Sequence, residues 1–562
     1  MRSRTLTDVD PLLKQLDLEE KVSLLAGQDF WSLPAIERIG LRSLVMSDGP
    51  IGVRGTGWAP DDPSIALPSP TALAAAWDVT LAETAGRLLG QESRRKGVHV
   101  LLGPTVNLQR TPLGGRHFEC YSEDPLLSGE IAVGFVRGVQ AHGVGTTVKH
   151  LVGNDFETDR MEVDVRIPER ALREIYLAPF ERVVNAGGWG VMSAYNGVNG
   201  SPMASNGTIQ HDILKTEWGF DGVVISDWRA ARETVGAALG GLDVAMPALE
   251  NPWGAKLVEA VRRGEVPEEV VDEKVRRVLL LALRVGALDG GDAITPPADL
   301  PGDATAHELA TRSFVLVKNE NYTLPLEPAA LTKLALIGAL AEDARVLGGG
   351  SAQVSPPHTI SPLAGLARAL SGVDVEYAVG ADPRPFLPAA HGPEWSDTTV
   401  TIGDHSFPVD QVAVRWIGSL PGGLEMTAVD GLTLTSTFTP GQPGEHTFAV
   451  SGFGNFTLTI NGSTLFQGAL HPPGAKRAEL LLAPKEQRVT LNLPADEPVQ
   501  IVLHQTITPG DAHSVATTFG HRPPGPDEDG MIEEAVRLAT TSDVAVVVVG
   551  TTEQVESEGF DR

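Results

Sequence analysis

The chain has 562 residues and a formal net charge of −28, from 44 Lys and Arg against 72 Asp and Glu. At roughly 150 residues per domain, this length predicts three or four domains. A surface this acidic repels phosphate backbones and anionic lipid headgroups, so it disfavours nucleic-acid and membrane partners and favours a small neutral ligand. The single cysteine, Cys120, excludes an intrachain disulfide.

The N-terminal segment shows no pattern of a secretory signal. It runs from Arg2 and Arg4 directly into an acidic amphipathic helix pattern, without the apolar stretch that such a signal needs. No segment reaches the roughly 18 consecutive apolar residues of a transmembrane helix. These features predict a cytoplasmic protein.

Residues 1–290 alternate short apolar runs with stretches long enough to form helices. This pattern is typical of βα units with a parallel sheet, and about 290 residues of it predict a TIM-like (β/α)8 barrel rather than a single open sheet. The apolar runs are 43–46, 98–102, 146–148, 190–194, 223–225 and 242–245.

Polar or reactive side chains follow five of these runs. Barrel enzymes place their chemistry at the C-terminal ends of the strands, so we expect these side chains to meet at one mouth of the barrel. They are Asp48, the loop 103–116, Lys149 with His150, Tyr195 with Asn196, and Asp227 with Trp228.

The residue pattern of the second half of the chain changes twice. A Pro- and Gly-rich linker at 291–305 leads into the first part of a second α/β domain at 306–380, with a sandwich of helices and strands. Residues 381–524 show short alternating runs rich in Thr, Gly and Pro, which predict an inserted β-sandwich. The α/β pattern resumes at 525–562. Its strand VAVVVVG needs cover on both faces, so we expect the chain to stop within this domain.

Two acidic regions hold candidates for catalysis. Asp227 ends a buried run just before a helical pattern, where a lone aspartate usually caps a helix; the alternative is a carboxylate nucleophile in a tight pocket. Glu553, Glu556 and Glu558 follow the last apolar run, where acidic side chains are usually solvated. The alternative is that one of them is the protonated partner of Asp227, because glycoside hydrolysis needs two carboxylates, about 5 to 5.5 Å apart when configuration is retained.

Metal, thiol and nucleotide chemistry find no support in the sequence. Lys149 and His150 precede a loop in which Glu157 and Arg160 fit an ion pair, but no HExxH or CxxC motif accompanies them. Cys120 fits a small buried apolar group better than a nucleophile. The segment GGGS at 348–351 lacks the Gly-Lys-Ser/Thr ending of a phosphate-binding loop. We therefore expect neither a metal nor a cofactor.

A set of motifs in fixed order closely resembles glycoside hydrolase family 3. The inserted sandwich resembles the protective-antigen-type, carbohydrate-binding-like domain of some family 3 β-glucosidases, including yeast enzymes and actinobacterial macrolide β-glucosidases. The family's usual C-terminal fibronectin-like domain has no counterpart in the sequence. The motifs span nearly the whole chain: MSDGPIGVR, LGPTVNLQRTPLGGRHFECYSEDP, VKHLVGNDFET, VMSAYNGVNG, GFDGVVISDW, ATRSFVLVKNENYTLPL, GGGS and ESEGFDR.

The resemblance implies a retaining, exo-acting β-glucosidase that works through a covalent glycosyl-enzyme. It makes Asp227, in ISDW, the nucleophile and Glu558, in SEGFDR, the acid/base. The residues that it implies for binding the sugar are Asp48, Arg54, Leu102, Arg116, Lys149, His150, Met192, Tyr195, Trp228 and Ser351.

The mechanism sets opposite demands on the two carboxyl groups. Asp227 must be ionised, and we expect Lys149, Arg116 and His150 to lower its pKa. Glu558 must hold a proton at neutral pH, and we expect partial burial beside a carboxylate to raise its pKa.

The substrate is expected to be a small neutral β-glucoside. Asp48 in SDGP is the residue that the family resemblance implies for a hexose, and KHLVGNDFETDR lacks the Asp-His pair of family members that act on N-acetylglucosamine. The alternatives are a β-xylosidase, a macrolide or other natural-product β-glucosidase of the same family, or a catalytically incomplete carbohydrate-binding protein. The sequence leaves the aglycone and a homo-oligomeric state open.

Overall fold

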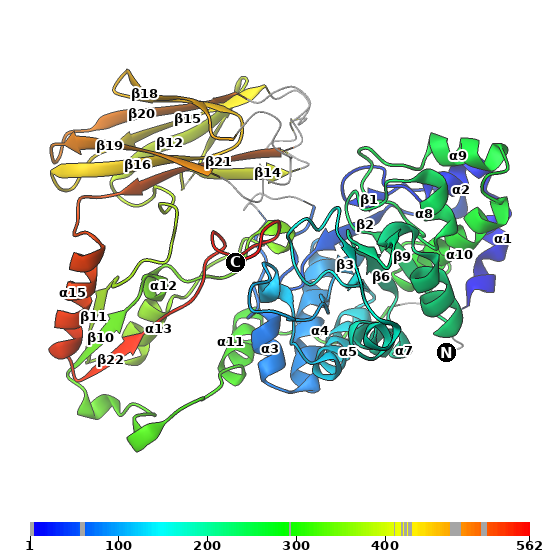
Figure 1. Cartoon of the computed structure of the whole chain (residues 1–562), viewed down its shortest axis with the longest axis horizontal. Coiled ribbons are helices and arrows are strands. Elements are labelled where there is room, and N and C mark those ends of the chain that lie inside the picture. The colour runs from blue at the N-terminus through cyan, green and yellow to red at the C-terminus, as the bar shows by residue number, and fades with distance from the viewer. Residues whose placement is uncertain are drawn as a thin grey trace.

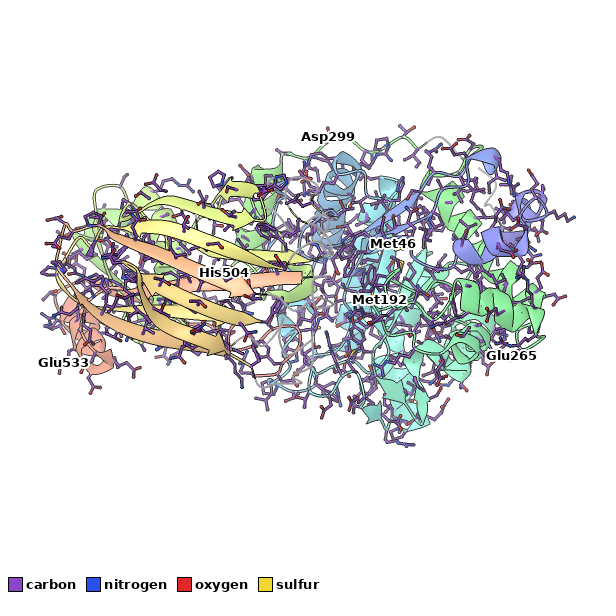
Figure 2. All side chains as sticks on the ribbon, turned by 90° about the horizontal axis from the view of Figure 1, so that it is seen from above. Met46, Met192, Glu265, Asp299, His504 and Glu533 are labelled. Atoms are coloured by element: carbon purple, nitrogen blue, oxygen red, sulfur yellow. The ribbon has the colours of Figure 1, made fainter. Side chains whose placement is uncertain are left out.

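The computed structural model describes residues 5–56, 62–291, 294–409, 411–417, 420, 424, 430–471, 485–506 and 514–562. Figure 1 shows strands surrounded by helices in the N-terminal half, and a smaller α/β layer with a β-sandwich above it in the other half. Seen from above, Met46 and Met192 lie within the first half and His504 lies on the sandwich (Figure 2). No helix in the described ranges is long and apolar enough to cross a membrane.

The first half is built on a six-stranded curved sheet in the order β1-β2-β3-β4-β6-β9. All neighbours are parallel except β1 and β2, which are antiparallel. The strands are β1 (Ser32–Leu33), β2 (Leu44–Asp48), β3 (Val100–Leu102), β4 (Gly145–Leu151), β6 (Gly190–Ser193) and β9 (Val223–Ser226). A small sheet holds β5 (Asp164–Val165), β7 (Gly197–Val198) and β8 (Ser201–Pro202).

Helices cover this sheet, and the amphipathic ones bury their apolar stripe against it. On α10, for example, Val271, Val275 and Val278 are fully buried. The helices are α1 (Asp10–Leu13), α2 (Leu18–Ser23), α3 (Pro70–Ala75), α4 (Val79–Arg95), α5 (Pro125–Ala141), α6 (Glu169–Ala171), α7 (Ala178–Asn185), α8 (Thr234–Leu239), α9 (Ala255–Arg262) and α10 (Glu268–Arg284).

The predicted α/β class is confirmed, and the sheet differs from eight regular parallel strands. Within the described residues, the apolar run 242–245 makes only single bridges, from Val244 to Ile225 of β9 and from Ala245 to Ala26. These bridges continue the curved sheet from β9 toward the N-terminal segment without a regular strand.

The second α/β layer is a three-stranded parallel sheet in the order β11-β10-β22. Leu334 and Leu336 pack toward α13, and Ala335 packs toward α15, so the central strand β10 is covered on both faces, whereas Val547 of the edge strand β22 is 59% exposed. The elements are β10 (Lys333–Ile337), β11 (Asp374–Ala378), β22 (Val544–Val547), α12 (Ala339–Glu342), α13 (Pro362–Ala369) and α15 (Glu528–Thr540). The helix α11 (Gly302–Arg312) precedes them and packs on the barrel instead, where Leu309 is part of the barrel core.

The β-sandwich lies in the sequence between β11 and β22, two strands of the same parallel sheet. Its two antiparallel sheets have the orders β13-β12-β15-β20-β17-β18 and β14-β21-β16-β19, and they enclose one apolar core. The strands are β12 (Trp395–Ile402), β13 (His405–Pro408), β14 (Ala413–Ile417), β15 (Gly431–Phe438), β16 (Gly444–Gly452), β17 (Asn455–Ile460), β18 (Ser463–Ala469), β19 (Lys485–Leu493), β20 (Val499–Thr506) and β21 (Ser514–Arg522).

A buried pair of histidines joins β16 and β21 inside the sandwich. Nδ1 of His446 lies 3.0 Å from Nε2 of His521, and Nε2 of His446 donates to the Gln442 carbonyl. The rings lie among Phe438 and Phe448. Burial, with a smaller contribution from His446, lowers the pKa of His521 to about 4.

We expect this pair to make the sandwich sensitive to acid. The unfolded chain takes up a proton on His521 near pH 6.5 and the folded chain only near pH 4, so stability is lost as pH falls between these values, by about 3 kcal/mol at pH 4. Hydrogen exchange of the β16 and β21 amides at pH 7 and pH 4 measures this loss. His521→Phe should reduce it, whereas His504→Gln, on an exposed histidine, should leave it unchanged; equal losses in all three proteins would contradict the assignment.

Candidate active site

The strand ends of the barrel bring most of the predicted residues together. Asp48 closes β2, in register with Leu102 of β3, and Lys149 and His150 lie in β4. Asp227 follows β9, and its N–H donates to the Ser193 carbonyl at the end of β6, next to Met192. The predicted convergence at one end of the parallel sheet is therefore what the fold produces.

Asp227 is a buried carboxyl group at this end of the barrel. Its Oδ1 accepts the N–H of Trp228 at 2.7 Å. Its Oδ2 is buried, lies 3.5 Å from Nε2 of His150, and accepts no hydrogen bond from the described part of the chain. The helix that follows, α8, has Glu233 as its N-cap, so Asp227 does not have the capping role.

Burial raises the pKa of Asp227 to about 6, although Arg116, Arg160 and Lys149 act to lower it. The prediction that nearby cations would bring this pKa below its ordinary value is therefore wrong, because desolvation outweighs their charges. His150 supplies no positive charge, since burial lowers its pKa well below 6.5 and keeps the ring neutral.

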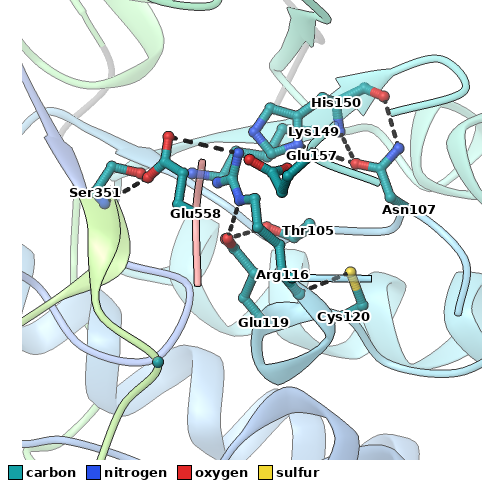
Figure 3. Close-up of polar contacts among 12 residues, drawn as sticks. Thr105, Asn107, Arg116, Glu119, Cys120, Lys149, His150, Glu157, Ser351 and Glu558 are labelled. Carbon is teal, nitrogen blue, oxygen red and sulfur yellow. Dashed lines mark hydrogen bonds and ion pairs between the residues drawn. The ribbon is translucent and has the colours of Figure 1, made fainter. Parts of the chain in front are cut away.

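Asn107 fixes the orientation of His150, and the sequence did not single it out. Its Nδ2 donates to the His150 carbonyl at 3.0 Å, so its Oδ1 accepts from both the N–H and Nδ1 of His150, at 2.8 and 2.9 Å (Figure 3). A neutral ring that donates through Nδ1 leaves Nε2 as an acceptor toward the Asp227 side.

A second buried pair lies beside it. Nζ of Lys149 donates to Oδ1 of Asp48 at 2.6 Å, and both side chains are almost fully buried. A paired ammonium and carboxylate present spare donor and acceptor positions, which suits neighbouring hydroxyl groups of a sugar.

Glu558 reaches the barrel from the second α/β layer. Its Oε1 lies 3.0 Å from Nη2 of Arg160. The same oxygen lies 3.8 Å from Nη1 of Arg116, and Oε2 accepts the N–H of Ser351 at 2.6 Å (Figure 3). Burial alone would raise the pKa of Glu558, but Arg116, Arg160 and Ser351 outweigh it and hold this pKa well below 4.5. The predicted protonated Glu558 is therefore wrong for this arrangement, and the carboxyl group is ionised.

Ser351 joins the second half of the chain to the barrel through its main chain. Its N–H binds Glu558, and its carbonyl accepts from the guanidinium of Arg54, which lies 4.3 Å over the ring of Trp31. The preceding residue, Gly350, has φ +69°, and a Cβ there would overlap Glu558. The predicted contribution of this segment to the site thus has a geometric basis.

Aromatic rings form one wall next to Asp227. The indole N–H of Trp228 donates to the Phe30 carbonyl at 2.8 Å, and its ring centroid lies 5.2 Å from that of Trp31. Tyr195 is partly buried, and desolvation with the nearby Asp227 carboxylate raises its pKa well above 10. The family resemblance implies Trp228 and Tyr195 for the sugar site but not Trp31.

Arg160 and Glu157 are connected to more residues of the site than the sequence indicated. Nη1 of Arg160 lies 2.7 Å from Glu157, Nη2 binds Glu558, and Cζ lies 4.5 Å from the centroid of the Tyr195 ring. The ion pair with Glu157 was expected, whereas the link to Glu558 joins residues 398 positions apart and leaves no local signal. Arg116 is held in the same way by Glu119.

The site holds two buried carboxyl groups among hydrogen-bond donors and aromatic rings. The pKa of Asp227 is raised and the pKa of Glu558 is lowered. The described residues include no group of three His, Cys, Asp or Glu side chains that could hold a metal ion. Such a pair fits the division of acid/base and nucleophilic work between two carboxyl groups.

Comparisons with known proteins agree with this chemistry. The model described as Glycosyl hydrolase family 3 N terminal domain matches residues 37–281, and that described as Glycosyl hydrolase family 3 C-terminal domain matches residues 314–562. A β-glucosidase from Rhizobium radiobacter is 39% identical over 572 residues, which cover 98% of this chain and 69% of that protein. Beta-glucosidase B from Emericella nidulans is 35% identical over 99% of this chain and 68% of its own length.

Solved structures show the same likeness. The β-glucosidase from Kluyveromyces marxianus aligns with a TM-score of 0.89 at 31% identity, over 100% of this chain and 70% of that one. DesR, a β-glucosidase from Streptomyces venezuelae in complex with D-glucose, aligns with a TM-score of 0.72 at 29% identity, over 100% of this chain and 68% of that one. The chain belongs to glycosyl hydrolase family 3.

Proposed function

We propose that the protein is a retaining, exo-acting β-glucosidase that hydrolyses terminal β-D-glucosyl residues. The observation that carries this proposal is the pair of buried carboxyl groups, Asp227 from the barrel and Glu558 from the second α/β layer, which interact with the same arginines, Arg116 and Arg160. Relatives over the whole chain are β-glucosidases, and a solved relative from Kluyveromyces marxianus is in complex with glucose.

In the first step, a carboxylate oxygen of Asp227 attacks the anomeric carbon. The bond from this carbon to the aglycone oxygen breaks, and a proton from Glu558 passes to that oxygen, so the aglycone leaves as an alcohol. In the second step, Glu558 takes a proton from water, the water oxygen attacks the anomeric carbon, and the bond to Asp227 breaks. Two displacements on opposite faces return the β configuration.

The surroundings fit one terminal glucosyl residue. Asp48 with Lys149, the guanidinium of Arg116 and Nε2 of His150 provide donors and acceptors for hydroxyl groups, and Trp228 offers an apolar ring face. The carboxyl groups and cations named here are each at most 7% exposed, which favours a single residue at the chain end over an internal one and supports exo action.

The domain division belongs to this proposal. We assign residues 1–290 to the barrel that carries Asp227, and 306–380 with 525–562 to the α/β domain that carries Glu558. Residues 381–524 form the inserted sandwich, consistent with its place between β11 and β22. We also propose a cytoplasmic location, in keeping with a chain that has a single cysteine.

The stereochemistry of the first product tests the proposed function. The full-length gene product is mixed with 4-nitrophenyl β-glucoside, and the anomeric proton of the released glucose is followed by NMR before mutarotation. We expect β-glucose first. Release of α-glucose would overturn the retaining mechanism, and glucose binding without turnover would favour the carbohydrate-binding alternative.

A further inference from the structure

The segment 551–562, which carries Glu558, lies across the barrel loops 113–116 and 154–160, and Asp561 contacts both loops. Its Oδ1 accepts the N–H groups of Gly115 and Glu157 at 2.9 and 2.8 Å. Its Oδ2 accepts the N–H and the hydroxyl of Thr158 at 2.9 and 2.6 Å. Burial alone would raise the pKa of Asp561, but these hydrogen bonds hold it below 3.8, so the group binds the loops as a carboxylate.

The two loops are the ones that carry the arginines of the site. Gly115 directly precedes Arg116, and Thr158 lies two residues before Arg160. Asp561 therefore connects the Glu558 segment with the same backbone that positions the two cations facing Glu558.

A second contact lies directly next to Glu558. The N–H of Gly559 donates to Oε2 of Glu157 at 2.7 Å, and the same carboxylate pairs with Arg160 at 2.7 Å. Glu157 therefore binds both Gly559, which follows Glu558 in the chain, and Arg160, which contacts the Glu558 side chain. This closed set of contacts leaves the Glu558 side chain little freedom relative to the barrel.

The surfaces of the segment and the loop also fit closely. A Cβ at Gly115 would overlap the carbonyl oxygens of Phe560 and Ser557, so only glycine allows the segment to approach this loop. The N–H of Arg562 donates to the Leu113 carbonyl at 2.8 Å, which continues the contact along the loop.

We propose that Asp561 is a positioning residue that docks the Glu558 segment onto the barrel loops 113–116 and 154–160. The proposal rests on the proposed role of Glu558 as acid/base. The two carboxyl groups of the reaction come from different domains, and a misplacement of about 1 Å can cost about 100-fold in rate. Asp561 accepts its hydrogen bonds from backbone amides and from the Thr158 hydroxyl, so it acts through Glu558 and not on the substrate.

The test compares aryl β-glucosides that differ in their need for acid catalysis. A phenyl leaving group needs the proton from Glu558, whereas a 2,4-dinitrophenyl leaving group departs without it. The ratio kcat/KM reports only the steps up to formation of the glycosyl-enzyme. Asp561→Asn keeps the size of the side chain but loses its charge and turns an NH₂ group toward N–H donors.

For Asp561→Asn in the full-length gene product, we expect kcat/KM to fall about 100-fold with the phenyl glucoside and less than about threefold with the 2,4-dinitrophenyl glucoside. Thr158→Val, which removes only the hydroxyl donor, should give a smaller fall with the same dependence on the leaving group. Glu553→Gln, on an exposed carboxylate of the same segment, is the matched control and should behave as the native protein.

An equal fall with both substrates would show a general loss of folded protein and would overturn the proposal. Glu558→Gln is measured in parallel to separate the positioning role of Asp561 from the acid/base role of Glu558. If Glu558→Gln shows the leaving-group dependence and Asp561→Asn does not, the positioning role alone fails. If Glu558→Gln shows none, the acid/base assignment fails, and the positioning role fails with it.

Discussion

Asp227→Ala should lower kcat/KM for an aryl β-glucoside by about four orders of magnitude, or about 5 kcal/mol of transition-state stabilisation. The reason is that alanine leaves no nucleophile for the anomeric carbon, while Lys149, His150 and Arg116 can still bind the sugar. We expect KM to change much less than kcat. Initial rates with 4-nitrophenyl β-glucoside measure the loss, and circular dichroism checks that the variant is folded.

Added azide should restore turnover of Asp227→Ala and identify the role of the lost group. Azide enters the space left by the carboxylate, attacks the anomeric carbon and displaces the aglycone, so the product is α-glucosyl azide. A β-glucosyl azide would instead indicate that Asp227 acts as the acid/base. Asp212→Asn, on an exposed carboxylate, serves as the matched control with native rates and no response to azide. A loss below about tenfold in Asp227→Ala would contradict its assignment as nucleophile.

The barrel half of the site could be predicted from the sequence because its signals are local. An apolar run followed at once by a polar residue marks the end of a buried parallel strand, and Asp48, His150 and Asp227 all follow this pattern. The run 242–245 carried the same signal without forming a regular strand, since pairing on both sides depends on residues distant in the sequence.

The links between the two halves of the chain could not be predicted in this way. Glu558 meets Arg160 across 398 positions, and Asp561 meets Gly115 across 446, so no spacing or periodicity records these contacts. The same holds for Asn107, whose role depends on the orientation of the His150 ring across 43 positions.

The pKa directions were predicted wrongly for both carboxyl groups, for one physical reason. A pKa depends on the balance between desolvation and the charges that remain in contact. At Asp227 burial prevails over more distant cations, whereas at Glu558 two arginines and the Ser351 N–H prevail over burial. The sequence names the charged residues but not the distances between them, and the balance depends on those distances.

The pKa of Asp227 is raised and that of Glu558 is lowered. When the two carboxyl groups hold one proton between them and no substrate is bound, that proton therefore lies on Asp227. The reaction with an ordinary leaving group needs the other arrangement, an ionised Asp227 and a protonated Glu558. Both arrangements carry one proton in total, so the ratio between them does not depend on pH. The arrangement with ionised Asp227 and protonated Glu558 is therefore a constant fraction of the singly protonated site. This site loses its proton near pH 6, the pKa of Asp227.

We therefore expect opposite pH profiles from the same enzyme with two substrates. With phenyl β-glucoside, kcat/KM should fall tenfold per pH unit above about pH 6, because the doubly ionised site has no proton to donate. With 2,4-dinitrophenyl β-glucoside, kcat/KM should rise with pH up to about 6 and then stay level, because only ionised Asp227 is needed. Steady-state rates between pH 4 and pH 9 measure both profiles.

The pH profile of the variant Glu558→Gln tests whether the charge of Glu558 affects the pKa of Asp227. The Glu558 charge is one of the causes that raise the pKa of Asp227, so its removal should move the midpoint for the 2,4-dinitrophenyl glucoside below pH 6. The midpoint would stay in place if the two groups did not interact. A native profile for phenyl β-glucoside that stays level from pH 6 to pH 8 would mean that Glu558 keeps its proton at neutral pH, and that Arg116 and Arg160 do not control its ionisation in the working enzyme.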